Sequence, residues 1–497
     1  RVDLSVGGKY IIWYEKEDSN FYSHGVETGE LTCLTCDIEA DFYDSDHDKP
    51  SLPGSYGLAG FTKGDESVLI YSRYDIWKID PSGNKLPINL TGQTGSNESI
   101  SYRYRHLEYD DPFIPLKKSI FLEGFNEATK ETWIYSSSAL LSMKPVALSE
   151  GNYHYKLQSR ARNADVLCWS KEDFDEYPDV YVSDPEFKQK HKISDANPQA
   201  VDYYWGSANL VHWTSYAGDD LDGILYIPED FNPEKKYPML VYFYEKRSER
   251  LHWHVSPAPS RSSLNFALAV SKGYVVFVPD IPYRTGNPGQ SAYDAVVSGA
   301  IAMCDQFSFI DRDNIGIDGQ SWGGYQVAWL ITRTNLFKAA MAGAPVSNMI
   351  SAYGGIRWES GRSRMMQYED GQSRIGGTLW QETDLYIENS PIFRVPEIET
   401  PLLIMHNDND GAVPWYQGIE LFVAMRRLNK PAWMLVYNDE AHNLSKWPNK
   451  VDLSIRMTQF FDHYLKGAPV PEWMATGIPA IDKGKTDGYR FMESEDK

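Results

Sequence analysis

Ser321 lies in the stretch "IGIDGQSWGGYQVAW", residues 315–329, where a strand-like run precedes it and a helix-like run follows it. Residues 319–323 fit the pattern G-x-S-x-G. Glycines on both sides of a serine allow the sharp strand-to-helix turn that exposes a nucleophile. The backbone N–H of Trp322, at the start of the helix, is then a candidate oxyanion donor. The stretch therefore predicts a nucleophilic serine.

A nucleophilic serine needs a general base, and three histidines follow Ser321 in the chain. His463 lies within an amphipathic helical pattern, and His406 ends the strand-like run "PLLIMH". His442 lies in "NDEAHNL", just beyond the strand-like run "AWMLVY", on a loop where a base can reach the serine. We therefore expect His442 to be the base.

The stretch "HNDNDGAVP" offers two candidates for the acid that would orient this base, Asp408 and Asp410. Either carboxylate could hydrogen-bond the imidazole, fix its tautomer and stabilise the imidazolium. Their spacing does not choose between them. The unused one is expected to be a turn residue bonded to nearby backbone N–H groups.

Strand-like and helix-like runs alternate from about residue 222 onwards, and several of the strands are apolar on both faces. This alternation indicates an α/β fold with a doubly wound, mostly parallel sheet covered by helices on both sides. Ligands bind at the carboxyl ends of the strands in such sheets. The boundary with the preceding part of the chain falls somewhere in residues 196–222.

The first two hundred residues instead consist of short strands and turns. Tyr22, Trp77, Trp133 and Tyr181 each stand in an alternating strand before a turn, at spacings of 55, 56 and 48 residues. This period suits the four-stranded blades of a β-propeller. Four such repeats predict either a fragment of a larger propeller or a smaller closed ring, and unrelated β-meanders are the alternative.

Composition narrows the classes of partner. The net charge of −21 argues against nucleic acid, because phosphate binding needs clustered Lys and Arg. No apolar run approaches the roughly 18 residues of a membrane span, so no membrane partner is expected. The first residue is Arg1 rather than Met, which suggests a processed or truncated chain. No HExxH, P-loop or dinucleotide fingerprint appears, and no metal or organic cofactor is expected.

Two further short motifs resemble metal-binding motifs but are not expected to bind a metal. Cys33 and Cys36 form a lone CxxC without a second pair, and we expect unremarkable strand-and-turn cysteines rather than a zinc or redox site. The acidic stretch "DFYDSDHD", residues 41–48, lacks the glycine and the terminal Glu of a calcium loop. A solvated turn is the favoured interpretation.

The stretches "GQSWGGYQ", "HNDNDGAVP" and "NDEAHNL" resemble those of the prolyl oligopeptidase family of serine peptidases, with its dipeptidyl-peptidase-like and acylaminoacyl-peptidase-like members. The resemblance is specific over about residues 205–465 and only general before them. It implies an α/β-hydrolase catalytic domain in residues 201–497. An all-β, incomplete β-propeller of about four blades would precede it in residues 1–200.

The resemblance also implies roles for single residues. Ser321 corresponds to the family's nucleophile and His442 to its "D-x-x-H" histidine. The family's acid stands four residues after the histidine of its "HGxxDxxV" segment, which selects Asp410. Tyr244, in "YPMLVYFYEK", corresponds to a tyrosine that donates to the oxyanion in the dipeptidyl-peptidase-like members, and Trp322 N–H would be the second donor.

The chain departs from the dipeptidyl peptidases near the expected specificity pocket. Residues 368–377, "YEDGQSRIGG", do not reproduce the paired tyrosines of those enzymes, and their acidic amine-binding motif is not recognisable in residues 1–200. The resemblance therefore does not by itself imply proline specificity or dipeptide release. Four arginines form a candidate pocket for an acidic group: Arg357, Arg362, Arg364 and Arg374. The favoured alternative is ion pairing with Glu359, Glu369 and Asp370.

The residues and the resemblance together predict acyl transfer through a Ser-Asp-His triad and an acyl-enzyme, with short or extended peptides as substrates. Two rival hypotheses remain: an esterase or deacylase that uses the same triad, and a binding protein whose triad is vestigial. By analogy with the family we expect a homodimer through the hydrolase domain. A bacterial periplasmic or secreted location is favoured over a cytoplasmic one.

Overall fold

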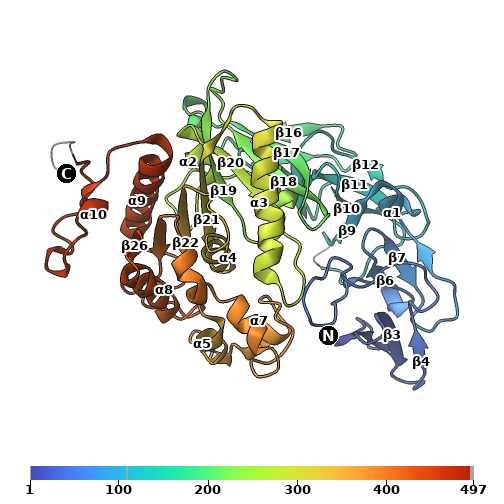
Figure 1. Ribbon diagram of the computed structural model, residues 1–497. Helices are drawn as coiled ribbons and strands as arrows, with labels where there is room; N and C mark the ends of the chain where they lie inside the picture. Colours follow the sequence, from blue (N-terminus) through green and yellow to red (C-terminus); the bar gives the residue numbers. More distant parts are fainter. Residues whose placement is uncertain (1, 108–109, 493–497) are drawn as a thin grey trace. The chain divides into compact units, whose positions relative to one another are not determined.

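A computed structural model describes residues 2–107 and 110–492 of the chain. The chain divides into two compact units (Figure 1). The first unit comprises Arg1–His47, Ser51–Val201 and Glu249–His254. The second comprises Asp48–Pro50, Asp202–Ser248 and Val255–Lys497. No sequence pattern predicts that Asp48–Pro50 belongs to the second unit or that Glu249–His254 belongs to the first.

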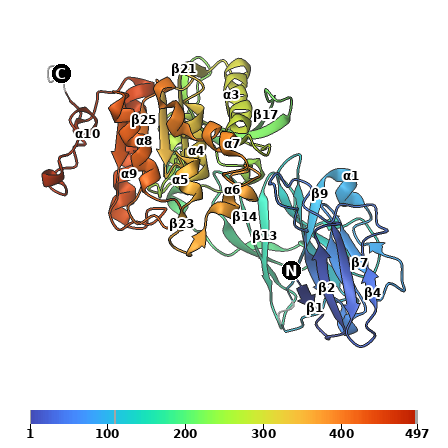
Figure 2. The same ribbon diagram turned by 60° about the horizontal axis from the view of Figure 1, so that its bottom comes forward.

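The first unit is built from antiparallel strands, which Figure 2 shows in blue to cyan. The strands form four successive groups of four: β1 Val2–Leu4, β2 Tyr10–Glu15, β3 Asn20–Gly25 and β4 Leu31–Cys33; β5 Leu58–Phe61, β6 Val68–Tyr71, β7 Ile76–Ile79 and β8 Ile88–Asn89; β9 Ile100–Arg105, β10 Ser119–Asn126, β11 Thr132–Ser138 and β12 Val146–Ala147; β13 His154–Arg160, β14 Leu167–Glu172, β15 Asp179–Ser183 and β16 Lys190–Lys192. A parallel pairing of Thr132 with His154 joins the third group to the fourth. Helical turns are short: η1 Lys63–Asp65, α1 Thr94–Glu98 and η2 Pro198–Asp202, the last of which ends at the boundary.

The four repeated aromatics occupy equivalent places in these groups. Tyr22, Trp77, Trp133 and Tyr181 lie on β3, β7, β11 and β15, the third strand of each group. The aromatic period therefore follows the structural repeat, and the predicted all-β first part is confirmed. Its description as a fragment of a larger propeller stays a prediction.

Cys33 and Cys36 form a disulfide, which differs from the expectation of two unremarkable cysteines. The turn after β4 brings their Cα atoms to 5.8 Å, within the usual range for a disulfide. A spacing of three residues is compatible with a bridge or with two free thiols, so the sequence could not decide. Cys168 and Cys304 are free.

The second unit contains an eight-stranded sheet in the order β17-β18-β20-β19-β21-β22-β25-β26. β17 and β18 are antiparallel to their neighbours, and the remaining strands run parallel. The strands are β17 Ser207–Thr214, β18 Asp220–Ile227, β19 Tyr237–Tyr242, β20 Val275–Pro279, β21 Ile310–Gln320, β22 Ala339–Gly343, β25 Leu402–Met405 and β26 Ala432–Leu435. A separate hairpin is formed by β23 Ile356–Arg357 and β24 Arg362–Ser363.

Helices lie along both faces of this sheet (Figure 1). The helices of the second unit are α2 Phe266–Ser271, α3 Pro288–Gln306, α4 Trp322–Leu330, α5 Met349–Tyr353, α6 Met365–Glu369, α7 Thr383–Glu388, α8 Tyr416–Arg427, α9 Trp447–Lys466 and α10 Glu472–Ala475, with the short 3₁₀ segments η3 Ser248–Arg250, which crosses into the first unit, η4 Pro391–Glu397 and η5 Ala480–Asp482. Of these, α2, α3, α4, α8 and α9 contact the strands of the sheet. Successive side chains of β21 alternate between the faces. Ile315 and Ile317 pack in a core with α3 and α4, whereas Gly316 lies against Phe461 and Leu465 of α9.

The predicted doubly wound, mostly parallel sheet is confirmed. Its central strands are apolar because both of their faces are buried. Within residues 2–107 and 110–492, no helix combines the length and the apolar character that crossing a membrane requires. The same described residues contain no cluster of His, Cys, Asp and Glu arranged to hold a metal ion.

Candidate active site

Ser321 stands at the turn between β21 and α4 with φ 62° and ψ −113°. This backbone conformation is rare for a residue with a side chain, and such strain is typical of functional sites. The turn needs its glycines. A Cβ on Gly319 would lie 2.5 Å from the carbonyl carbon of Gly323, and one on Gly324 would lie 2.2 Å from the oxygen of Gly343. Ser321 N–H donates to that Gly343 oxygen at 2.8 Å, which fixes the turn to β22.

His442 and Asp410 are hydrogen-bonded side chain to side chain. His442 Nδ1 lies 2.7 Å from Asp410 Oδ2. The other carboxylate oxygen, Oδ1, accepts from the backbone N–H groups of Ala412 and Val413, both at 2.8 Å. Asp410 is therefore locked in one orientation, with Oδ2 presented to the imidazole.

A second histidine lies on the same carboxylate. His406, fully buried at the end of β25, places Nε2 at 3.4 Å from Asp410 Oδ2 and donates to Val413 O at 3.1 Å. Burial opposes ionisation of Asp410, but hydrogen bonds from His406 and His442 outweigh it and hold the pKa of Asp410 below its usual range. Asp410 is thus a stable anion beside His442.

Asp408 has a different environment. Its Oδ1 accepts from Asp439 N–H at 2.8 Å, and its Oδ2 accepts from the Asn438 side-chain amide at 2.5 Å. Asp408 thus connects its own loop to the loop that carries His442. Of the two aspartates left open by spacing, Asp410 contacts the histidine.

The His442 loop is held next to Ser321 by its backbone. Gln320, the residue before Ser321, donates its side-chain amide to His442 O at 3.1 Å. On the other side, Leu444 N–H donates to Arg261 O at 2.8 Å, and Ser262 Oγ donates to Asn443 Oδ1 at 2.5 Å. The first contact joins the end of β21 to the loop that follows β26, and the other two attach this loop to the segment before α2.

Glu440 is a structural element of this loop that the sequence analysis missed. It is fully buried, and its carboxylate accepts from Ser445 N–H at 2.8 Å and from Lys446 N–H at 3.0 Å. Burial would raise its pKa, but these hydrogen bonds and one from Asn449 lower it to about 2. The sequence carried no signal for this role, because Glu440 bonds to the loop residues before α9 and does not cap the helix.

The two candidate oxyanion donors both lie near the serine turn. Trp322 is the first residue of α4, so its N–H belongs to the helix N-terminus. Tyr244 follows β19, and its Cδ2 atom lies 3.8 Å from where a Cβ of Gly323 would stand. The Tyr244 carbonyl accepts from Tyr283 Oη at 2.7 Å and from the Gln326 amide at 3.0 Å, which fixes the backbone here.

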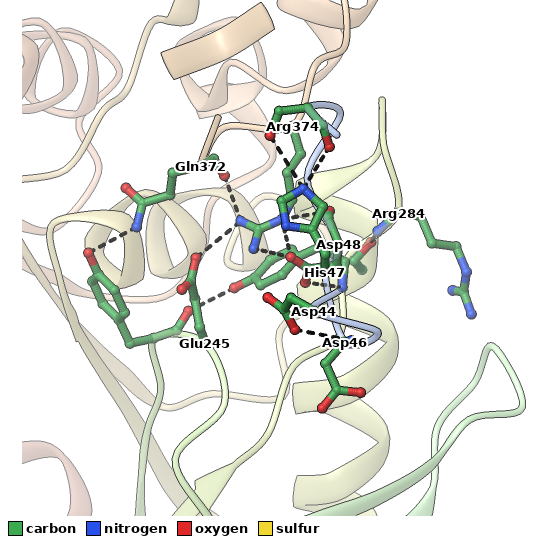
Figure 3. Close-up of polar contacts among 12 residues, drawn as sticks. Asp44, Asp46, His47, Asp48, Glu245, Arg284, Gln372 and Arg374 are labelled. Carbon is green, nitrogen blue, oxygen red and sulfur yellow. Dashed lines mark hydrogen bonds and ion pairs between the residues drawn. The ribbon is translucent and has the colours of Figure 1, made fainter. Parts of the chain in front are cut away.

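The four arginines do not share one environment. Arg357 and Arg362 are exposed on the β23–β24 hairpin, whereas Arg364 and Arg374 are buried. Arg364 donates to the Ala412 carbonyl. Arg374 pairs with two carboxylates other than those expected: its Nη2 lies 2.6 Å from Asp48 Oδ1 and its Nη1 lies 3.1 Å from Glu245 Oε1 (Figure 3). A role for the four in substrate specificity stays a prediction.

Asp318, three residues before Ser321 on β21, is expected to make stability depend on pH. It is fully buried; Oδ2 accepts from Leu264 N–H at 2.7 Å, and Oδ1 has no hydrogen-bond partner among the described residues. Burial raises its pKa from 3.8 to about 7, although hydrogen bonds from Leu264 and Gly319 oppose the rise. Between these values the folded chain keeps a proton that the unfolded chain releases, so stability falls as pH rises from about 4 to 7.

Asp318→Asn removes this titration. The free energy of unfolding of the variant minus that of the unsubstituted chain should be roughly 2–3 kcal/mol higher at pH 8 than at pH 5, because only the unsubstituted chain loses this stability as pH rises. Urea unfolding followed by tryptophan fluorescence at both pH values measures the difference. Fixed packing effects of the asparagine cancel in this comparison. An equal effect of the substitution at the two pH values would contradict the assignment.

The strand order, the serine turn and the His–Asp pair at the carboxyl edge of the sheet define an α/β-hydrolase. Residues 259–468 match the sequence model of the Prolyl oligopeptidase family. The second unit of this chain therefore carries a domain of that family of serine-type peptidases.

Individual relatives agree with this placement. The chain is 26% identical over 413 residues to dipeptidyl peptidase 8 of Mus musculus, covering 77% of this chain and 42% of the relative. It is 25% identical over 396 residues to dipeptidyl-peptidase 5 of Porphyromonas gingivalis, covering 75% and 54%. The chain thus spans about half the length of the curated relatives that it matches.

A solved structure is similar in fold to both units of this chain. The puromycin-hydrolyzing peptidase of Mycobacterium tuberculosis aligns over 93% of this chain and 69% of its own, with a TM-score of 0.64 and 17% sequence identity. At this identity the alignment speaks for the fold alone. It agrees with the predicted fold class, an α/β-hydrolase preceded by an all-β propeller region.

Proposed function

We propose that this chain is a serine peptidase that cleaves peptide bonds with Ser321, His442 and Asp410. The observation that carries the proposal is the 2.7 Å contact between His442 Nδ1 and Asp410 Oδ2, on a loop bonded to the residue before Ser321. Because Asp410 Oδ1 is occupied by two backbone N–H groups, Oδ2 remains for the imidazole. A base oriented in this way beside a half-buried serine fits the arrangement that acyl transfer needs.

In the proposed reaction, His442 accepts the proton of Ser321 as the serine oxygen attacks the peptide carbonyl. Asp410 accepts the hydrogen bond from Nδ1–H and stabilises the imidazolium that forms. The Trp322 N–H and the Tyr244 hydroxyl donate to the tetrahedral oxyanion. His442 then gives its proton to the leaving amine. Water, deprotonated by the same histidine, releases the acyl group from Ser321.

The proposed substrates are short or extended peptides. The relatives are named dipeptidyl peptidases, which favours amide over ester bonds. Esterase or deacylase activity on the same residues remains the rival hypothesis, since the triad chemistry is shared. A binding protein with a vestigial triad is the second rival.

A peptide library with mass-spectrometric detection, together with matched amide and ester substrates, tests the proposal. We expect cleavage at defined peptide bonds, because the proposed site combines a serine, an oriented base and two candidate oxyanion donors, and we expect a fluorophosphonate to label Ser321. The heat-denatured chain is the control for non-specific labelling. Ester turnover without cleavage of any peptide would support the esterase. A chain that neither cleaves nor becomes labelled would favour the binding protein.

A further inference from the structure

Two residue pairs that are distant in sequence meet next to the serine turn. Gln372 Nε2 donates to Tyr244 Oη at 3.1 Å, and the neighbouring residues Arg374 and Glu245 form an ion pair at 3.1 Å. Figure 3 shows Gln372, Glu245 and Arg374 grouped in this way. The segment after α6 is therefore attached to the strand end that carries Tyr244 by two separate contacts.

The direction of the Gln372 bond determines what the tyrosine can do. A phenol has one proton to donate and lone pairs that accept. When the amide N–H of Gln372 occupies a lone pair of Tyr244 Oη, the phenolic proton has to point elsewhere and is available to a developing oxyanion. Donation to a phenol oxygen also polarises its O–H bond, which makes the hydroxyl a stronger donor.

The guanidinium of Arg374 fixes the backbone of Gln372. Its Nη1 donates to the Gln372 carbonyl at 2.7 Å as well as to Glu245. Its Nε donates to the Asp48 carbonyl at 3.1 Å, and its plane lies over the Tyr283 ring, with 4.1 Å from Cζ to the ring centroid. Arg374 itself has φ 52°, an uncommon conformation that this set of contacts holds in place.

The backbone of Tyr244 is fixed through the same cluster. Tyr283, the ring beneath the guanidinium, donates its hydroxyl to the Tyr244 carbonyl at 2.7 Å. The cluster thus holds both partners of the hydrogen bond, Gln372 through Arg374 and Tyr244 through Tyr283. A buried arginine in a surface-loop segment, paired with Asp48 and Glu245, would otherwise cost desolvation energy without an evident function.

We propose that Gln372 is a positioning residue that orients the Tyr244 hydroxyl toward the oxyanion, and that Arg374 holds Gln372 in place. This inference rests on the proposed function, in which Tyr244 is an oxyanion donor. Gln372 contacts the tyrosine and not the reacting atoms. Its removal should therefore slow attack by Ser321 only while the Tyr244 hydroxyl is present.

The test is a double-mutant cycle on the full chain, with the rate of phosphonylation by a fluorophosphonate as readout. The probe develops negative charge on oxygen when the serine attacks, so no natural substrate is needed. The variants are Gln372→Leu, which removes the donor, and Gln372→Glu, which replaces it with an acceptor. Each is made alone and combined with Tyr244→Phe. Substitution of Arg374 is avoided, because an uncompensated buried pair would destabilise the fold.

We expect Tyr244→Phe to slow phosphonylation about 100-fold, as for loss of one oxyanion donor. Gln372→Leu should slow it about 3- to 10-fold, and Gln372→Glu should slow it more because the carboxylate accepts a hydrogen bond from the tyrosine hydroxyl and turns its proton away from the oxyanion. In the Tyr244→Phe background neither Gln372 substitution should have a further effect. Unchanged thermal unfolding midpoints for the Gln372 variants would accompany this result.

Equal slowing by the Gln372 substitutions with and without the Tyr244 hydroxyl would overturn the inference, because that result indicates a general structural role. An unchanged or faster rate for Gln372→Leu would overturn it as well, since the amide would then accept from the tyrosine. If the unsubstituted chain is not labelled, the proposed function itself fails and the inference fails with it. The two failures are distinguished by whether the unsubstituted chain reacts.

Discussion

Ser321→Ala is expected to reduce peptide hydrolysis about 10⁴- to 10⁶-fold, as removal of the nucleophile does in other triad enzymes. The substitution deletes the only atom in the proposed site that forms a bond to the acyl group. Alanine keeps the Cβ that the turn already accommodates, and the N–H of residue 321 still donates to Gly343 O. Fold and thermal unfolding should therefore remain close to those of the unsubstituted chain. Residual hydrolysis would come from the oxyanion donors and binding alone.

Turnover of the best peptide from the library and covalent labelling by a fluorophosphonate measure this effect. Ser271→Ala is a matched control, because Ser271 is an exposed serine of α2 whose hydroxyl donates within its own helix turn, to Leu268 O at 2.9 Å. The control should keep full turnover. Undiminished hydrolysis by Ser321→Ala would assign the nucleophile to another residue.

Local patterns were sufficient to predict the elements that carry the site. Ser321 was identified because a strand, two glycines and a helix stand in immediate succession, and each of these signals depends on neighbours within a few residues. The parallel sheet was predicted from two signals: strands alternate with helices, and several strands are apolar on both faces. The equivalent strands of the first unit were detectable because Tyr22 and its counterparts recur with the structural repeat.

Choices that depend on side-chain direction could not be made from spacing. Asp408 and Asp410 have the same chemistry two residues apart, and only the resemblance to a family favoured Asp410. In the structure their carboxylates have different partners, because Ala412 and Val413 N–H groups turn Asp410 toward His442 while Asp408 bonds to Asp439. Because this loop has no regular periodicity, the sequence does not show in which direction each carboxylate points.

Contacts between distant segments were beyond reach as well. Arg374 was expected to pair with acidic residues close to it in the chain, but its partners are Glu245 and Asp48, the latter 326 residues away. Gln372 gave no signal, because a glutamine in a polar loop is ordinary until its amide is seen on Tyr244. Pairing over such separations follows from the tertiary fold and not from local sequence.

Asp410→Asn is expected to lower kcat about 10⁴-fold, by analogy with the same substitution in another triad. The geometry gives the reason. The asparagine oxygen would keep the hydrogen bonds from Ala412 and Val413, so its NH₂ group would replace Oδ2 and face His442. An NH₂ donor forces Nδ1 to accept. The imidazole proton then moves to Nε2, which is the atom that has to take the proton from Ser321.

Asp408→Asn is the matched control, because it makes the same chemical change two residues away. Its Oδ1 can still accept from Asp439 N–H, and only the bond from the Asn438 amide is lost. We expect kcat to fall less than about 10-fold in this variant, through loosening of the His442 loop. The decisive measurement is the ratio of the two effects on kcat and on the phosphonylation rate of Ser321. Equal losses, or a larger loss for Asp408→Asn, would contradict Asp410 as the residue that orients His442.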